Sequence, residues 1–132
     1  MKKEELIMLL QDIAEEDANL VRLKIFYVKR RKNKLKDIKI IAKYGLENGL
    51  FELLYYKKDD KSGIRYPVII ENVKESIKII ENNDMWNEID YGLCFADTIK
   101  YYWILFGPYG PVGDHAFEGA RIPDEFTQFI ID

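Results

Sequence analysis

Nucleophiles and metal ligands are scarce in this chain of 132 residues. It has one cysteine, Cys94, and one histidine, His115, and its only other hydroxyl or thiol nucleophiles besides tyrosine are Ser62, Ser76, Thr98 and Thr127. A zinc site normally needs several Cys or His ligands, and nucleophilic catalysis needs a nucleophile paired with a base. We therefore predict no catalytic residue, no metal and no cofactor.

Other features are also missing from the sequence. A lone cysteine cannot form an internal disulfide, and the chain does not begin with a charged and then apolar leader. Its apolar runs are shorter than the stretch of about 20 residues that spans a membrane. These absences predict a cytoplasmic protein with no membrane contact. No stretch forms a motif that is diagnostic of a family.

Charge of one sign is concentrated in each half of the chain. Residues 1–66 hold 16 Lys/Arg and 11 Asp/Glu, whereas residues 67–132 hold 4 and 12, within a formal net charge of −3. If the halves do not interleave, this division predicts a bipolar surface that attracts a charged partner.

A β-hairpin is predicted over residues 38–57. Asn48 and Gly49 lie between two runs with alternating apolar residues, and this dipeptide favours a tight type I′ turn. In the resulting register Tyr44 faces Leu53, and one face of the hairpin gathers most of the apolar side chains.

Further strands are predicted over residues 20–29 and 64–70, which alternate in the same way. Pro67 cannot donate a ladder hydrogen bond, so the second of these strands is expected at a sheet edge. Residues 99–106 are rich in aromatic and β-branched side chains and are predicted as a buried strand, with a helix over 97–106 as the alternative.

Three helices are predicted to cover this sheet. They span residues 2–17, residues 72–82 with Asn72 as cap and Glu75 three positions later, and residues 123–130 after Pro123. The fold class is thus a single α+β domain over residues 1–132, with an antiparallel β-meander of four or more strands packed against two or three helices.

The first helix carries its charges against its dipole. Glu15, Glu16 and Asp17 lie at its negative end, where carboxylates are unfavourable. One explanation is packing near Arg22 or Lys24, and the other is a basic surface on a partner.

The predicted function is a small binding protein that acts by occupying a macromolecular partner, as an inhibitor, an immunity protein or a phage-type antagonist does. Aromatic anchors with charge around them favour interfaces. The predicted contact surface is acidic and aromatic, and a basic protein is the expected partner; its residues are Glu81, Asp84, Trp86, Glu88 and Asp90.

Nucleic-acid binding is the alternative function. A basic segment over residues 29–36 offers cations for phosphate contacts, namely Lys29, Arg30, Arg31, Lys32 and Lys34. We expect this segment to be a solvated turn between two strands.

An enzyme is the third alternative. The segment 107–122 contains four glycines and two prolines and gathers an imidazole, two carboxylates and a guanidinium, from Asp114, His115, Glu118 and Arg121. These groups suit proton transfer or metal binding. The competing explanation is a loop held by ordinary hydrogen bonds.

Overall fold

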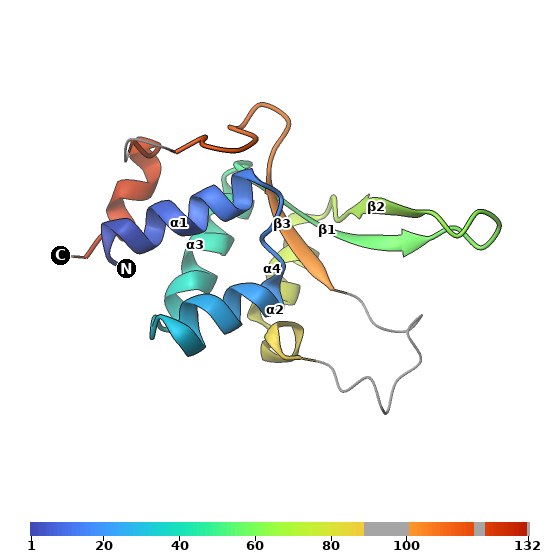
Figure 1. The fold of residues 1–132 in the computed structure, drawn as a ribbon, viewed down its shortest axis with the longest axis horizontal. Helices are drawn as coiled ribbons and strands as arrows, with labels where there is room; N and C mark the ends of the chain where they lie inside the picture. The colour runs from blue at the N-terminus through green and yellow to red at the C-terminus, as the bar shows by residue number, and fades with distance from the viewer. Residues whose placement is uncertain (89–100, 118–120, 132) are drawn as a thin grey trace.

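A computed structural model describes residues 1–88, 101–117 and 121–131. Within these residues the chain is α+β, with one antiparallel sheet and helices packed against it (Figure 1). In chain order the elements are α1 (Lys3–Ala14), α2 (Leu20–Leu23), the π-helix η1 (Lys24–Arg30), α3 (Leu35–Glu47), β1 (Phe51–Lys58), β2 (Arg65–Ile69), α4 (Val73–Glu81), the 3-10 helix η2 (Asn83–Trp86), β3 (Tyr102–Phe106) and the 3-10 helix η4 (Asp124–Phe129).

The sheet has three strands in the order β2-β1-β3. In the antiparallel register Leu54 of β1 lies between Ile69 of β2 and Trp103 of β3. The predicted meander of four or more strands is therefore wrong. Two of the segments predicted as strands fold as helices.

The first of these segments is the amino-terminal arm of the predicted hairpin. Residues 35–47 form α3, so Tyr44 does not face Leu53, which instead pairs with Ile104. The buried residues of α3 follow helical spacing: Ile38, Ile41, Ala42, Gly45 and Leu46. Asn48 and Gly49 still punctuate the chain, but they end a helix, with Asn48 as C-cap and Gly49 at φ 69°.

The second segment is residues 20–29, which form α2 and η1. The side chain of Asn19 accepts a hydrogen bond from the Val21 amide at 2.9 Å, which caps the helix. Leu20, Leu23 and Tyr27 are the residues that become fully buried, and their spacing of three and four is helical. The basic segment 29–36 consequently joins two helices and not two strands.

Several predicted elements are confirmed. The structure contains α1, β2, α4, β3 and, after Pro123, η4. Strand β2 lies at a sheet edge, as Pro67 required, and β3 excludes the helical alternative for residues 102–106. The side chain of Asn72 caps α4 by accepting from the Glu75 amide at 3.2 Å.

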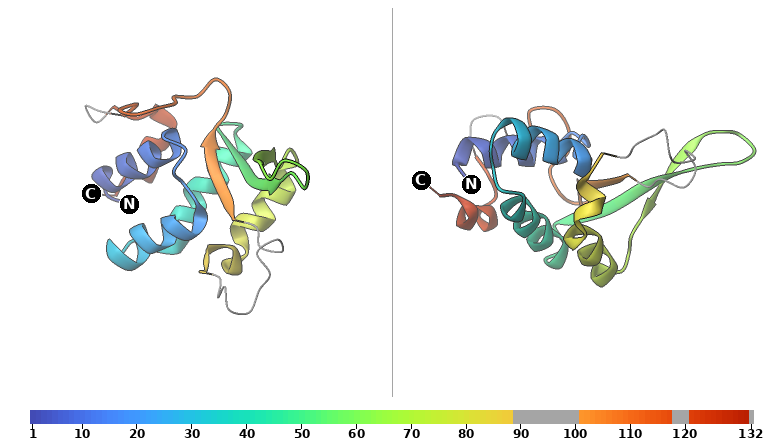
Figure 2. Two further views of the ribbon diagram at one scale, coloured as in Figure 1. Left: turned by 45° about the vertical axis from the view of Figure 1, so that its right-hand side comes forward. Right: turned by 90° about the horizontal axis from the view of Figure 1, so that it is seen from below.

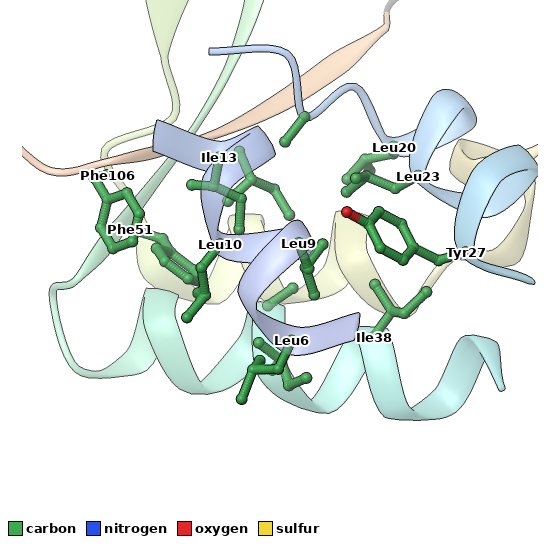
Figure 3. Close-up of a cluster of buried hydrophobic side chains, with 14 of the residues drawn as sticks. Leu6, Leu9, Leu10, Ile13, Leu20, Leu23, Tyr27, Ile38, Phe51 and Phe106 are labelled. Carbon is green, nitrogen blue, oxygen red and sulfur yellow. The ribbon is translucent and has the colours of Figure 1, made fainter. Parts of the chain in front are cut away.

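The core lies between the helices and one face of the sheet. Figure 3 shows Leu6, Leu9, Leu10 and Ile13 of α1 directed toward side chains from η1, α3, β1 and β3. The ring of Phe51 stacks on Phe126 at a centroid distance of 5.5 Å and meets Phe106 edge to face at 5.2 Å. Segments near the two ends of the chain are joined as well, because the Met1 ammonium group donates to the Phe129 carbonyl at 3.1 Å.

No described helix combines the length and the apolar character needed to cross a membrane.

The contact between α3 and β1 depends on a glycine. A β-carbon placed on Gly45 would overlap the ring of Phe51, which is itself fixed by two other aromatic rings. We expect Gly45→Ala to lower the free energy of unfolding by about 1–3 kcal/mol, because overpacking outweighs the gain in helix propensity. Chemical denaturation of the variant measures this loss.

A double-mutant cycle isolates the cause. In a Phe51→Leu background the added methyl group has room, so Gly45→Ala should cost clearly less there than in the parent protein. Strict additivity of the two substitutions would show that the ring is not what requires glycine at this position.

Candidate functional site

A groove between α1 and η1 is the strongest candidate site in the described part of the chain. It encloses about 880 Å³, within the range typical of ligand pockets. Two neighbouring segments and one that is distant in sequence form it. Its lining residues are Ile7, Met8, Gln11, Asp12, Glu15, Asp17, Arg22, Leu23, Ile25, Phe26, Tyr27, Arg30, His115 and Phe117.

The α1 wall comes from the side of the helix next to its buried stripe. Ile7, Gln11 and Glu15 are spaced four residues apart, as are Met8 and Asp12, so these side chains form two adjacent rows along the groove. Ile7 and Met8 are only half-buried, which leaves apolar surface facing the groove.

The opposite wall is a π-helix. The Arg31 amide donates to the Phe26 carbonyl five residues earlier at 3.1 Å, and η1 extends over seven residues. Such helices are rare in proteins, and many of those that occur lie at functional sites. Ile25, Phe26 and Arg30 of η1 line the groove, and Tyr27 borders it as well although its side chain is buried in the core.

A hydrogen bond joins the two walls. The Tyr27 hydroxyl donates to Oδ2 of Asp12 at 2.6 Å, and Tyr27 is fully buried, with an exposed fraction of 0%. Burial raises the pKa of Asp12, and the hydrogen bond from Tyr27 opposes that rise. Burial and the adjacent carboxylate raise the pKa of Tyr27, so its hydroxyl stays protonated and remains the donor.

Charges of both signs surround the apolar walls. Asp12, Glu15 and Asp17 lie toward the carboxyl end of α1, where Glu15 accepts from Nε2 of Gln11 at 2.8 Å. Arg22 and Arg30 come from the opposite wall and are exposed. The charge of Arg22 acts on Asp12 and lowers its pKa, although burial has the larger effect.

The third part of the groove is formed by His115 and Phe117 of the glycine-rich loop, the segment 107–122. Gln11 holds this loop by donating to the Gly113 carbonyl at 3.2 Å and accepting from the Phe117 amide at 2.8 Å. The Gly113 amide also donates to the Ala14 carbonyl at 2.9 Å. Ordinary hydrogen bonds therefore fix the loop, and they bring His115 and Phe117 to the groove.

Two other residues predicted in this loop, Asp114 and Arg121, do not line the groove. Asp114 and Arg121 are exposed, and Glu118 is outside the described residues. Among the described residues, no group of three or more His, Cys, Asp or Glu side chains is placed to hold a metal ion.

The predicted acidic and aromatic surface lacks its aromatic anchor. Trp86 is 1% exposed, and its Nε1 donates to the Ile80 carbonyl at 2.9 Å, so its side chain belongs to the core. Glu81, Asp84 and Glu88 are exposed, whereas Asp90 is outside the described residues. The use of the three exposed carboxylates as a contact surface stays a prediction.

Lysines from the first half of the chain lie against this acidic region. Lys43 pairs with Glu81 at 2.9 Å, Lys39 donates to the Glu81 carbonyl at 3.3 Å, and Lys24 donates to Asn87. The two halves thus interleave here, and the condition for a bipolar surface is not met at α3 and α4.

In the basic segment 29–36, Arg31 pairs with a residue of the fold, whereas the other cations of the predicted contact are exposed. Nε of Arg31 lies 2.7 Å from each carboxylate oxygen of Glu5, and this pairing lowers the pKa of Glu5. The other cations of the predicted nucleic-acid contact are exposed: Lys29, Arg30, Lys32 and Lys34. Their role in nucleic-acid binding stays a prediction.

The chain matches no protein family, no curated protein and no solved structure.

The hydrogen bond between the walls gives the folding stability a defined pH dependence. Since the pKa of Asp12 is raised above its ordinary value of 3.8, the folded protein keeps that proton to a higher pH than the unfolded chain. Asp12 therefore makes the protein less stable as the pH rises through this window. Asp12→Asn removes the titration and keeps an oxygen that accepts from Tyr27.

We expect the melting temperature of Asp12→Asn, relative to the parent protein, to increase as the pH rises above 3.8, the ordinary pKa of this group. Glu16→Gln, which removes a carboxylate from an exposed position nearby, should show no comparable trend. A difference for Asp12→Asn that stays constant with pH would contradict the assignment.

Tyr27→Phe should lower the free energy of unfolding by about 1–3 kcal/mol, because it leaves the half-buried carboxylate without its donor.

Proposed function

We propose that this chain is a binding protein that acts by occupying a macromolecular partner, and that the groove between α1 and η1 receives an amphipathic helix of a partner protein. Inhibitors, immunity proteins and phage-type antagonists act in this way. The observation that carries the proposal is the groove itself, which combines apolar walls with charges of both signs.

The apolar lining of the groove favours a helical segment. Recognition of a helix in a groove uses apolar side chains at positions i, i+3, i+4 and i+7, which enter an apolar trough along one line. Ile7 and Met8 on one wall, and Ile25 and Phe26 on the other, supply apolar surface for such side chains. Methionine also adapts its shape to a guest side chain, which suits Met8 to this role.

The charges favour a basic group on the incoming helix. Asp12 and Glu15 already accept hydrogen bonds from Tyr27 and Gln11, while Asp17 is exposed at the same end of the groove. All three carboxylates lie near the negative end of the α1 dipole, where a nearby cation is favourable. A Lys or Arg beside the apolar anchors would satisfy these carboxylates, and Arg22 and Arg30 would repel a cation placed toward the other wall.

Peptide display tests this proposal with helices of defined chemistry. A library of amphipathic helices with varied anchors and varied flanking charge is selected on the immobilised protein. We expect enrichment of helices with Leu, Ile or Phe at helical spacing and a Lys or Arg next to them. Selected peptides should bind Ile25→Glu at least about tenfold more weakly, because a carboxylate would be buried in the interface.

Two variants serve as controls. Ile40→Glu makes the same substitution at an isoleucine on α3 that is 45% exposed and lies outside the groove, so it should leave peptide binding unchanged. Reversal of Glu81, Asp84 and Glu88 to Lys tests the acidic surface on α4 and η2. Peptides that lose affinity for the charge-reversed protein and keep it for Ile25→Glu would assign binding to that surface and refute the groove.

A further inference from the structure

The β1–β2 hairpin extends away from the body of the protein. Figure 1 and the right-hand view of Figure 2 show its far end beyond the helices, with the connecting turn at the tip. The side chains reflect this position, since Tyr56 is 41% exposed and Tyr66 is 43% exposed. Part of the hairpin is thus a ribbon that reaches into solvent.

One face of this ribbon combines an aromatic ring with two cations. In the register Tyr56 lies opposite Pro67 and Lys58 lies opposite Arg65, and residues 56 and 58 point to the same side of the sheet. Toward the body, Tyr56 meets Trp103 edge to face at 5.0 Å. The opposite face carries a second such pair, Lys57 beside Tyr66.

The cations of the hairpin form no ion pair with the described part of the chain. The ion pairs within those residues are Arg31 with Glu5 and Lys43 with Glu81, and neither involves the hairpin. The hairpin holds four cations, Lys57, Lys58, Lys61 and Arg65, and three carboxylates, Glu52, Asp59 and Asp60.

The turn itself engages one of these three carboxylates. Asp59 accepts from the Lys61 amide and the Ser62 hydroxyl, each at 3.0 Å, so it stabilises the turn. The opposition of Lys58 and Arg65 across the strands places like charges side by side, which costs stability in the isolated protein. An anion bound at this face would offset that cost.

We propose that the β1–β2 hairpin is a binding site for single-stranded nucleic acid. Proteins that bind single strands combine cations along the phosphate backbone with aromatic side chains on which bases stack. Lys58 and Arg65 provide the first of these features, and Tyr56 beside Trp103 provides the second.

Two other occupants fit the hairpin less well. A peptide that adds a strand to the sheet needs a continuous row of backbone donors, and Pro67 interrupts that row at the edge strand β2. Duplex nucleic acid keeps its base faces stacked inside the helix, so it cannot use the exposed tyrosine rings.

Fluorescence anisotropy with a labelled oligothymidylate of about 15 nucleotides tests the site. We expect binding to the parent protein at about 50 mM salt, with an affinity that falls as salt rises. Lys58→Ala with Arg65→Ala should make the slope of log K against log salt less steep by about 1.4, the value for two phosphate contacts to a single strand. Tyr56→Leu should weaken binding roughly 5- to 150-fold, and Tyr56→Phe, which keeps the ring, should retain it.

A matched pair of cations provides the control. Lys32→Ala with Lys34→Ala removes the same charge from exposed positions of the basic segment and should leave both the affinity and the salt slope close to those of the parent. Equal losses in the two double variants would show nonspecific attraction, and a loss only in the Lys32 and Lys34 variant would assign binding to the basic segment. Either result overturns the proposal, as would equal affinity for a duplex of the same length or no binding of the oligothymidylate at low salt.

Discussion

The burial of one tyrosine, with its hydroxyl still hydrogen-bonded, determines how the first two helical segments pack. Tyr27 is among the largest fully buried side chains, and a buried hydroxyl without a partner costs free energy. Asp12 on α1 provides the acceptor, so a direct hydrogen bond from the Tyr27 hydroxyl joins η1 to α1. The groove lies between these two helices, and both partners of this bond are among its lining residues.

The same constraint explains why the groove is both apolar and charged. The buried stripe of α1 is used by the core, which leaves Ile7 and Met8 beside it without full cover. The turn after α1 then returns the chain with Asp17 and Arg22 on either side of the groove. Gln11 completes the arrangement by attaching the glycine-rich loop through its side chain.

Elements with local signals could be predicted from the sequence. The Asn72 cap identified α4, Pro67 placed β2 at an edge, and the aromatic run before Gly107 identified β3. Residues 38–46 could not be assigned in this way, because their apolar side chains satisfy an alternation of two and a helical period equally well. Packing of Ile38, Ile41 and Leu46 in the core decides for the helix.

Most residues of the candidate site could not be predicted from the sequence. Its residues come from three separate segments, and sequence reasoning singles out few of them. Glu15 and Asp17 are noted for the alternative of a basic surface on a partner, whereas Arg30 and His115 are named for other roles. Asp12 and Tyr27 carry no recognisable motif, and their significance depends on a contact between residues 15 positions apart. For Trp86 the sequence misleads in the opposite way. Its acidic neighbours suggested an exposed aromatic anchor, but its side chain is buried in the core.

Methyl NMR of the protein with a selected peptide tests most directly whether the groove is the binding site. With labelled isoleucine and methionine methyl groups, the proposal predicts that Ile7, Met8 and Ile25 shift on titration, while the exposed residues Ile40, Ile64 and Ile69 keep their positions. Shifts confined to these exposed isoleucines, with the three groove residues unchanged, would contradict it.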